Sequence, residues 1–223
     1  MFFTISFVCF GIFSALVSGQ KSGYALELPA QGVTDFANIW GMLPLTEFTV
    51  CFWLKTTAVT GCPFSYASTN TFQNELLFFN PSSFELNVGN QAVPTGVSAA
   101  DGKWHQICAT WSNDNGAWKF CKDGVLGKSG TNLVKGHTIQ PGGSLILGQE
   151  QDTVGGTFDK TQSFVGRLAF VNVWSYTLPG DAIKEYARCC LAGEGNVYTW
   201  SDFIYGIRGN PRMVIPAGCP CAL

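Results

Sequence analysis

The stretch WHQICATWSNDNGAWKFCKDG, residues 104–124, decides the fold class. Residues 104–111 and 117–121 are short runs rich in aromatic and β-branched residues, a composition that favours strands. Residues 113–116, Asn-Asp-Asn-Gly, and the pair Asp123 and Gly124 have the composition of turns. The stretch therefore predicts two short strands separated by a turn.

Similar segments occur on either side of this stretch. Residues 48–54, FTVCFWL, and residues 167–174, RLAFVNVW, are again short, aromatic and β-branched. Residues 179–188 are predicted to be helical, because Ile183 and Tyr186 fall on one face of a helix there. Strands that recur along the chain with one short helix indicate an all-β protein. We expect an antiparallel jelly-roll β-sandwich of the concanavalin or laminin-G-like type.

The N-terminal segment has the composition of a secretory signal peptide. The first 18 residues carry no charge and are mostly apolar, and the run ends in the small residues Ser18 and Gly19. We predict a signal peptide over residues 1–19, one domain over residues 20–223 and a secreted, extracellular protein. The segment lacks the usual Lys or Arg, so an uncleaved signal anchor is the alternative. No second apolar run approaches the ~20 residues of a membrane-spanning helix.

Composition and motifs argue against nucleic-acid binding and catalysis. The formal net charge is −2 and the 13 Lys and Arg are scattered, whereas nucleic-acid binding requires a basic patch. The domain has only two histidines, His105 and His137, and no G-x-S-x-G elbow. A jelly-roll glycoside hydrolase is the enzyme alternative, because Glu150 and Asp152 form a Glu-x-Asp pair. The second catalytic Glu that this chemistry needs is absent from the residues that follow, so we expect a binding protein and not an enzyme.

Several segments resemble the pentraxin family and occur in the same order. Residues 107–111, ICATW, are similar to the core of the pentraxin signature, and residues 48–51 are similar to the strand that holds its disulfide partner. Further matching segments are residues 64–67, 73–79, 147–152 and 171–174. Gln106 and Asn113 depart from the signature, which has His and Ser or Thr at these positions. The resemblance extends from Tyr24 to the last predicted strand, near Val214.

The cysteines are predicted to form disulfides. Removal of Cys9 with the signal peptide leaves eight, an even number in an oxidising compartment. The resemblance implies a bond between Cys51 and Cys108. The other cysteines are open to several pairings: Cys189 or Cys190 with Cys219 or Cys221, and Cys62 with Cys121 by elimination. Either set could instead link subunits. A zinc site built from the four C-terminal cysteines is a further alternative, although their spacing lacks C-x2-C.

The resemblance also implies two calcium ions (Ca2+) per subunit. Calcium binds six to eight oxygen atoms from carboxylates, amides, backbone carbonyls and water, and the segment after residue 147 is rich in such groups. The implied ligands are Glu150 and Asp152 on both ions, the Gln151 backbone carbonyl and Asn74 on the first, and Asp159 and Gln162 on the second. Gln73 stands where the family has Asp, so we expect a weaker first site. A solvated acidic loop without a metal is the alternative.

An anionic ligand is the partner that such a site implies. Two calcium ions carry four positive charges and the three carboxylates of the loop return three negative ones, so a positive surplus and open positions remain. Phosphomonoesters, phosphocholine, phosphoethanolamine and acidic carbohydrates all suit these positions. Phe79 matches the family's aromatic wall, with a place in the core as the alternative. The acidic position that receives choline falls near Ala92, with Gln91 beside it.

These features together predict a secreted, calcium-dependent pattern-recognition protein, lectin-like, with a role in innate immunity and the acute phase. It would capture microbial or damaged-cell surfaces. The resemblance implies a homo-oligomer, a pentamer whose head-to-tail interfaces close into a ring. The alternative is an extracellular adhesive or structural module of the laminin-G-like type, in which calcium is structural.

Overall fold

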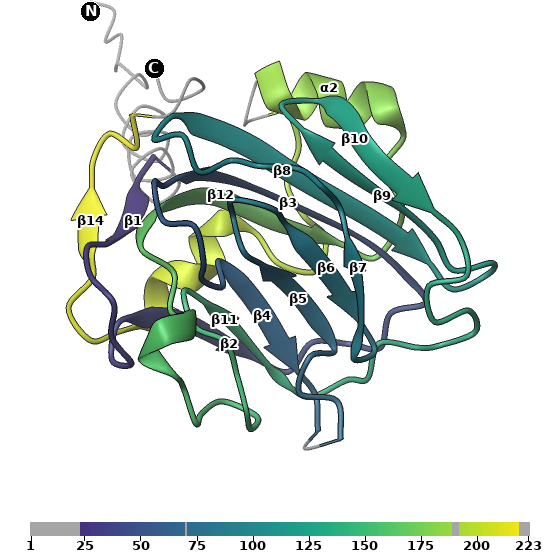
Figure 1. Cartoon of the computed structure of the whole chain (residues 1–223), viewed down its shortest axis with the longest axis horizontal. Coiled ribbons are helices and arrows are strands. Elements are labelled where there is room, and N and C mark those ends of the chain that lie inside the picture. The colour runs from purple at the N-terminus through teal and green to yellow at the C-terminus, as the bar shows by residue number, and fades with distance from the viewer. Residues whose placement is uncertain (1–22, 70, 189–191, 219–223) are drawn as a thin grey trace, which may run out of the picture.

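The computed structural model describes residues 23–69, 71–188 and 192–218. Over these residues the chain folds into two seven-stranded antiparallel sheets that pack face to face (Figure 1). Sheet A has the strand order β10-β9-β8-β3-β12-β1-β14, and sheet B has the order β13-β2-β11-β4-β5-β6-β7. The predicted all-β jelly-roll sandwich is confirmed.

The bounds of the elements are as follows. Sheet A contains β1 (Ala25–Leu28), β3 (Glu47–Lys55), β8 (Trp104–Ser112), β9 (Ala117–Lys122), β10 (Val125–Gly130), β12 (Gly166–Trp174) and β14 (Arg212–Val214). Sheet B contains β2 (Phe36–Trp40), β4 (Phe64–Ala67), β5 (Leu76–Phe79), β6 (Glu85–Val88), β7 (Gln91–Pro94), β11 (Ser144–Leu147) and β13 (Ile207–Arg208). The described helical segments are α2 (Gly180–Arg188) and the 3₁₀ helices η1 (Lys160–Gln162) and η2 (Trp200–Gly206).

The stretch over residues 104–124 forms β8, a turn and β9, as its composition predicts. Ser112 lies opposite Ala117 where the two strands meet the turn, and β8 pairs along its other edge with β3. The predicted helix over residues 179–188 is α2. The sequence pattern does not predict η1 and η2, because three and seven residues are too few for a helical period to be visible.

The core lies between the two sheets. Phe52 of sheet A meets Phe78 of sheet B edge-on, with ring centroids 5.2 Å apart, and both side chains are fully buried. Side chains alternate between the two faces of a strand. Leu76 and Phe78 of β5 therefore belong to the core cluster, whereas Leu77 and Phe79 do not and lie on the outer face of sheet B. This alternation determines which residues of sheet B are available to a ligand.

A row of cysteines crosses the outer face of sheet A. Cys51 on β3 and Cys108 on β8 are directly opposite each other and form a disulfide, as the resemblance implies. Cys121 on β9 lies opposite Cys108 on its other side. Ile183 and Tyr186 of α2 belong to the same buried cluster. Helix α2 therefore covers this part of sheet A (Figure 1).

The pairing of Cys62 with Cys121 is wrong, since both thiols are free and buried. Cys62 lies just before β4 of sheet B, where its thiol donates to the carbonyl oxygen of Phe64 at 3.3 Å. Cys121 lies in sheet A, beneath α2. The two residues belong to different sheets, so a disulfide between them would require large backbone movement. Cys189, Cys190, Cys219 and Cys221, together with the predicted signal peptide, fall outside the described residues.

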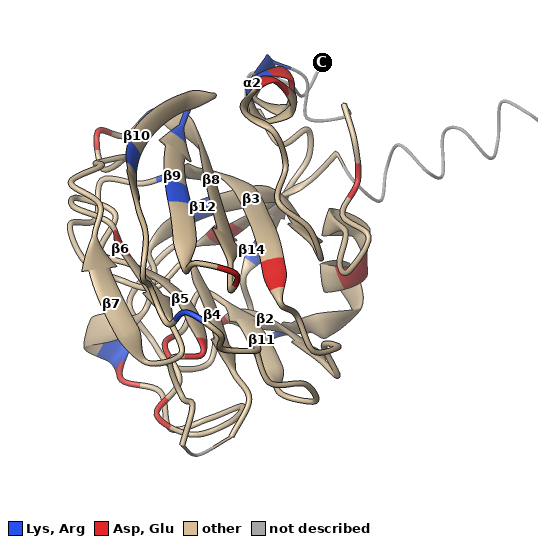
Figure 2. Cartoon of the chain, turned by 90° about the vertical axis from the view of Figure 1, so that its right-hand side faces the viewer, with Lys and Arg blue, Asp and Glu red and all other residues tan. Residues whose placement is uncertain are grey.

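Charged side chains are distributed over the surface. Figure 2 shows Lys and Arg spread over several strands and α2 instead of gathered in one patch. Within the described ranges, no helix has the length and apolar character needed to cross a membrane.

Candidate metal centre

The loop over residues 148–162 is anchored on the outer face of sheet B. Ile146 of β11 is fully buried although it lies outside the core cluster, so a segment of chain covers it. Gln151 provides the anchor: its Nε2 donates to the carbonyl oxygens of Ser65 and Ser144 at 3.2 and 3.0 Å, and its Oε1 accepts from Gly155 N at 2.8 Å. The Gln151 side chain is thus occupied by the fold, which leaves its backbone carbonyl as the group that a metal could use.

The loop folds back toward the end of sheet B at which Asn74 lies. It leaves β11 after Leu147, but Gln151 bonds to Ser144 at the start of that strand. Gly155 then packs on Trp40, whose partner in register is again Ser144. A Cβ at Gly155 would lie 2.7 Å from the Trp40 ring, and its φ of +79° also favours glycine. Figure 1 shows the loop and the turn before β5 at the same end of the sandwich.

Strand register explains why Asn74 is at this end. Leu76, two residues after Asn74, lies opposite Tyr66 of β4, and Tyr66 lies opposite Leu145 near the start of β11. Two segments far apart in the sequence, the turn at Asn74 and the loop after β11, therefore lie at the same end of sheet B.

Three predicted ligands in the loop are carboxylates, and, in addition to burial, two of them, Asp152 and Asp159, raise the pKa of the third, Glu150. Glu150 is only 5% exposed. Its burial, and then the negative charges of Asp152 and Asp159, raise the pKa of Glu150 to about 7. Asp159 caps η1, where its Oδ1 accepts from Thr161 N at 2.8 Å, and the bonds with Thr161 lower the pKa of Asp159. A cation would relieve the repulsion that these groups impose on Glu150.

The turn of η1 sets the relation between the two ligands predicted for the second ion. Asp159 is the N-cap of η1 and Gln162 is its last residue, and Gln162 N donates to Asp159 O at 3.0 Å. Both residues therefore belong to one short, hydrogen-bonded turn.

Unpartnered oxygens distinguish this region. Among the described residues, buried acceptor oxygens of amides or carboxylates without a hydrogen-bond partner occur at Asn74 Oδ1, Gln149 Oε1 and Glu150 Oε2. Two of these three residues are predicted calcium ligands. A buried acceptor without a partner destabilises a protein by roughly 1–3 kcal/mol, and calcium is a suitable partner because it binds carboxylate and amide oxygens.

No group of three His, Cys, Asp or Glu side chains in the described part of the chain is placed so that it could hold a metal ion. Calcium also binds amide and backbone oxygens freely. The unpartnered amide oxygen of Asn74 is therefore a potential calcium ligand in addition to the carboxylate of Glu150.

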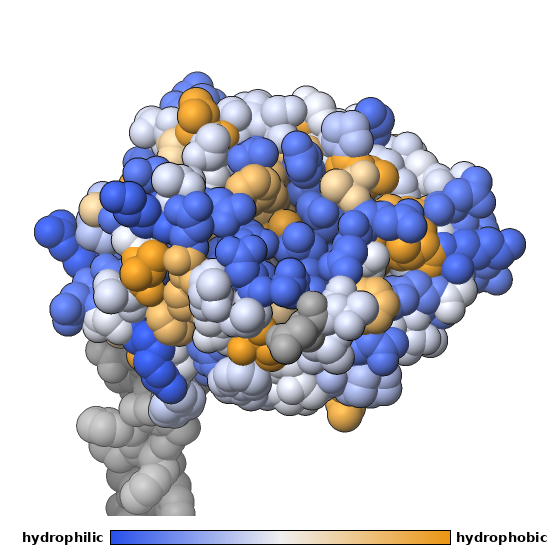
Figure 3. Space-filling model, turned by 60° about the horizontal axis from the view of Figure 1, so that its bottom comes forward, coloured by the Kyte–Doolittle hydropathy of each residue, from blue (hydrophilic) through white to orange (hydrophobic). Residues whose placement is uncertain are grey.

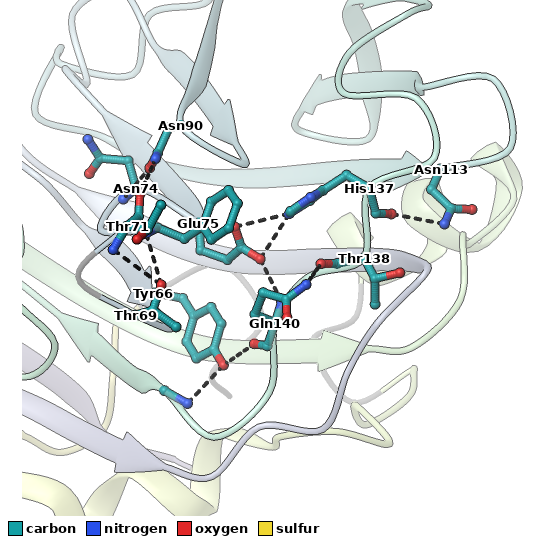
Figure 4. A network of polar contacts seen from close by, with 12 residues as sticks. Tyr66, Thr69, Thr71, Asn74, Glu75, Asn90, Asn113, His137, Thr138 and Gln140 are labelled. Atoms are coloured by element: carbon teal, nitrogen blue, oxygen red, sulfur yellow. Dashed lines mark hydrogen bonds and ion pairs between the residues drawn. The ribbon is translucent and has the colours of Figure 1, made fainter.

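The backbone of Asn74 is held by the neighbouring turn. Asn74 N donates to Asn90 Oδ1 and Asn90 N donates to Asn74 O, both at 3.0 Å. Asn90 Nδ2 also donates to Thr71 O. Figure 4 shows these contacts around the turn. Gln73 is half-buried beside Asn74, at the position where the family's Asp would add a charge.

Comparison with known proteins identifies the family. The sequence model of the Pentaxin family matches residues 25–215. The chain belongs to the pentraxin family. It is 41% identical over 209 residues to human neuronal pentraxin-1, an alignment that covers 86% of this chain and 48% of that protein. It is 36% identical to the rat Sushi, von Willebrand factor type A, EGF and pentraxin domain-containing protein 1, over 90% of this chain and 6% of that protein. The chain thus spans about half the length of the neuronal pentraxins that it matches.

Solved structures agree with the fold. The heptameric SAP-like pentraxin from Limulus polyphemus superposes with a TM-score of 0.78 at 23% identity, over 91% of this chain and 99% of that chain. At this identity the superposition supports the sandwich architecture alone.

In this pentraxin, strand register places the predicted ligand-binding residues on two different faces of sheet B. Phe79 lies on the outer face and is half-buried, opposite Glu85 of β6. Ala92 lies opposite Asn87, on the same outer face as Leu77. Gln91, by contrast, lies opposite Val88, a core residue. The acidic side chain nearest to Phe79 in register is therefore Glu85.

Sequence reasoning did not single out several residues of this region. Glu85 is visible only once β5 and β6 are in register. Trp40, 58% exposed beside the loop, requires knowledge of the fold-back. Figure 3 shows this side of the pentraxin as a largely polar surface with small apolar patches. Glu75 and His137 are 62 residues apart in sequence, yet His137 Nε2 contacts both carboxylate oxygens of Glu75.

Proposed function

We propose that this pentraxin is a secreted, calcium-dependent binding protein that captures phosphate-bearing or acidic-sugar ligands on surfaces. One observation carries the proposal: Asn74 and Glu150 each hold a buried oxygen without a hydrogen-bond partner, and the turn and the loop that carry them lie at the same end of the sandwich (Figure 1). The ligands of the first ion would be Asn74, Glu150, Asp152 and the Gln151 carbonyl, with Gln73 adjacent. Glu150 and Asp152 would be shared with a second ion that Asp159 and Gln162 complete.

Bound calcium would supply positive charge and open coordination positions to an anion. Side chains of this chain would hold the loop in place and contact the apolar part of the ligand. Gln151 and Gln149 fasten the loop to the sheet and to residues 32–35 through their side-chain amides. The alternation of β5 places Phe79 on the outer face, where its ring can contact the apolar part of a ligand.

The position of Glu85 bears on choline selectivity. Directly opposed residues of an antiparallel pair have Cβ atoms ~5 Å apart, so Glu85 and the Phe79 ring can face one ligand group together. A quaternary ammonium is attracted by an aromatic face and by a carboxylate. We therefore propose that Glu85 takes the role that the resemblance assigned to an acidic residue near Ala92. Phosphocholine and phosphoethanolamine then remain candidate ligands.

Binding, and not catalysis, is the proposed activity. Both ring nitrogens of His105 contact carboxylates, Asp123 at 2.7 Å and Asp101 at 2.9 Å, so this imidazole has no free nitrogen with which to activate a nucleophile. We also propose that residues 1–19 are removed on secretion and that residues 20–223 form one pentraxin domain.

Assembly into a closed homo-oligomeric ring is part of the proposal. The resemblance implies five subunits, whereas the solved pentraxin from Limulus polyphemus is described as heptameric. A ring turns weak single-site binding into strong binding on a repetitive surface, because later contacts occur at an effective concentration on the order of millimolar. The mass of the native particle in calcium would give the number of subunits.

A second function is favoured by one comparison. In the rat relative the aligned region makes up 6% of a long protein whose name includes several other domain types, so a pentraxin domain can be one module among many. The alternative is therefore an extracellular adhesive module in which calcium only stabilises the loop.

Retention of the secreted protein on immobilised phosphocholine and phosphoethanolamine separates the two functions. We expect binding in calcium and elution by a chelator. If the protein passes both columns while calcium still raises its melting temperature, the metal is structural and the adhesive function takes the lead. If calcium changes neither retention nor melting temperature, both proposals fail.

A further inference from the structure

Glu75 is a buried carboxylate at the edge of the proposed metal centre, and a compact set of donors holds it (Figure 4). It is fully buried and directly follows Asn74. Its Oε1 accepts from Gln140 N at 2.6 Å, and His137 Nε2 lies 3.0 and 3.1 Å from its two oxygens. A buried charge is costly unless it is paired and hydrogen-bonded, so these contacts keep Glu75 in place.

His137 is itself fixed from several directions. It lies in the segment between β10 and β11, where its N donates to Val134 O and its O accepts from Asn113 Nδ2, both at 2.9 Å. Its ring contacts Phe72, in the turn before Asn74, with ring centroids 5.2 Å apart. His137 therefore joins the turn before Asn74, through Phe72, to the segment between β10 and β11, through its backbone bonds.

The turn that carries Asn74 is thus clamped between two segments. On one side the turn at residues 89–90 holds its backbone, because Gly89 N donates to Glu75 O and Asn90 N to Asn74 O, both at 3.0 Å. On the other side His137 and Gln140 hold the Glu75 carboxylate. With the backbone of the turn held on one side and the adjacent Glu75 side chain on the other, the position of Asn74 is restricted.

The segment with His137 and Gln140 is also bonded to the start of β11, the strand that precedes the loop with Glu150. Gln140 O accepts from Tyr66 Oη at 2.6 Å, and Tyr66 Oη accepts from Gly143 N at 3.1 Å. Gly143 immediately precedes β11, the strand that runs into the loop with Glu150. The Glu75 network therefore connects the turn at Asn74 with the strand that bears the acidic loop.

We propose that Glu75 and His137 are positioning residues for the first calcium ion, which hold Asn74 in register with the loop that carries Glu150. The inference rests on the proposed calcium site. Neither side chain is assigned as a ligand. Residues that orient metal ligands in this way typically change metal affinity by ~10–100-fold when they are replaced.

The protein contains a matched control in His105. This imidazole also contacts carboxylates, Asp101 and Asp123 at 2.9 and 2.7 Å, but it lies in sheet A with no predicted calcium ligand beside it. Loss of either histidine removes an imidazole–carboxylate contact. Only loss of His137 is expected to change calcium binding.

The test is calcium titration by calorimetry of the wild type and of the variants His137→Phe, His137→Gln, Glu75→Gln and His105→Phe. Phe keeps a ring at residue 137 but removes the donor to Glu75, whereas Gln keeps a donor. We expect His137→Phe and Glu75→Gln to weaken calcium affinity ~10-fold at the site of the first ion, which includes Asn74. The affinity of His137→Gln at that site should lie closer to that of the wild type, and affinity at the site of the second ion should change little. His105→Phe should lower the melting temperature in chelator and leave calcium affinity at both sites unchanged.

The outcomes are distinguishable from failure of the proposed function. If the wild type binds no calcium, the proposed function fails and this inference fails with it. If the wild type binds calcium but His137→Phe and Glu75→Gln bind it equally well, only the inference is overturned. It is also overturned if His137→Gln loses as much affinity as His137→Phe, because the donor to Glu75 would then be irrelevant.

Discussion

The outer faces of the two sheets are covered in contrasting ways. On sheet A, α2 covers the Cys51–Cys108 disulfide, and Asn172 beside it is fully bonded, with its Oδ1 accepting from Gly195 N and its Nδ2 donating to Phe170 O. On sheet B, the loop over residues 148–162 brings carboxylates together and leaves Glu150 Oε2 without a partner. The cover of the disulfide on sheet A is formed by apolar side chains of α2, whereas the cover of sheet B is suited to a cation. Stability should therefore depend on covalent linkage at one face and on calcium at the other.

The largest expected effect is on sheet A. Replacement of both Cys51 and Cys108 by Ala removes a bond that spans 57 residues, for which the chain-entropy model gives about 4 kcal/mol of unfolding free energy. Urea unfolding in chelator measures this loss, and calcium affinity should change little because the disulfide is on the other sheet. The double variant is needed because Cys121 lies opposite Cys108 and could replace Cys51 as its partner. A loss of calcium affinity as large as the loss of stability would show that the two faces are not independent.

The next effect is on sheet B and should change sign with calcium. Glu150→Gln removes a buried charge that Asp152 and Asp159 repel. In chelator at pH 8 we expect a higher melting temperature than in the wild type, because an uncompensated charge is lost. In calcium we expect a lower one than in the wild type, because a shared ligand is lost. A variant that is destabilised equally in both conditions would show that Glu150 has a purely structural role.

The pH dependence of the calcium-free protein tests the same charge without a mutation. The pKa of Glu150 is raised from 4.5 to about 7 in the folded state, so the native state binds more protons than the unfolded state between these values. The contribution of Glu150 to stability is therefore fully present below about pH 4.5 and is lost as the pH rises through about 7. In chelator, the melting temperature of the wild type should fall as the pH rises across this window, and that of Glu150→Gln should fall less. Equal profiles for the two proteins would contradict the assignment.

The difference between the two faces also explains how much the sequence could predict. The strands, α2 and the Cys51–Cys108 bond follow from local composition and from the resemblance, because period-two alternation is a short-range signal. The ligand candidates Glu150 to Gln162 are visible as a cluster of oxygen-bearing residues. Glu85, Trp40 and the contact of Glu75 with His137 are not visible, because each depends on strand register or on the way the loop folds back. The error for Cys62 and Cys121 has the same origin, since elimination ignores which sheet each cysteine belongs to.

A smaller effect is expected where the chain departs from its family at the first ion. Gln73→Asp adds a carboxylate beside Asn74, and ligand charge tunes calcium affinity. We expect calcium affinity at the site of the first ion, beside residue 73, to rise several-fold in calorimetric titration, with affinity at the site of the second ion unchanged. Lys160→Gln is a useful control, because it also makes the protein more negative but lies in η1, next to the second site. If both variants raise affinity at the same site, the cause is overall charge and not ligation by residue 73.

The smallest effect concerns the choice of ligand. Glu85 and Phe79 are opposed across β5 and β6, on the face that also presents Leu77 and Asn87, and Glu85 is half-buried. A partly exposed ionic contact is typically worth ~0.2–1 kcal/mol, so Glu85→Gln should weaken phosphocholine by only ~1.5- to 5-fold. Inorganic phosphate has no cationic group, so its affinity should stay the same or rise slightly as one negative charge is removed. The informative quantity is therefore the affinity for phosphocholine divided by the affinity for inorganic phosphate, both measured in calcium. This ratio should fall in Glu85→Gln. It should not fall in Gln91→Ala, because register places Gln91 on the side of Val88. An unchanged ratio in Glu85→Gln together with a lower one in Gln91→Ala would reverse the assignment of the two residues.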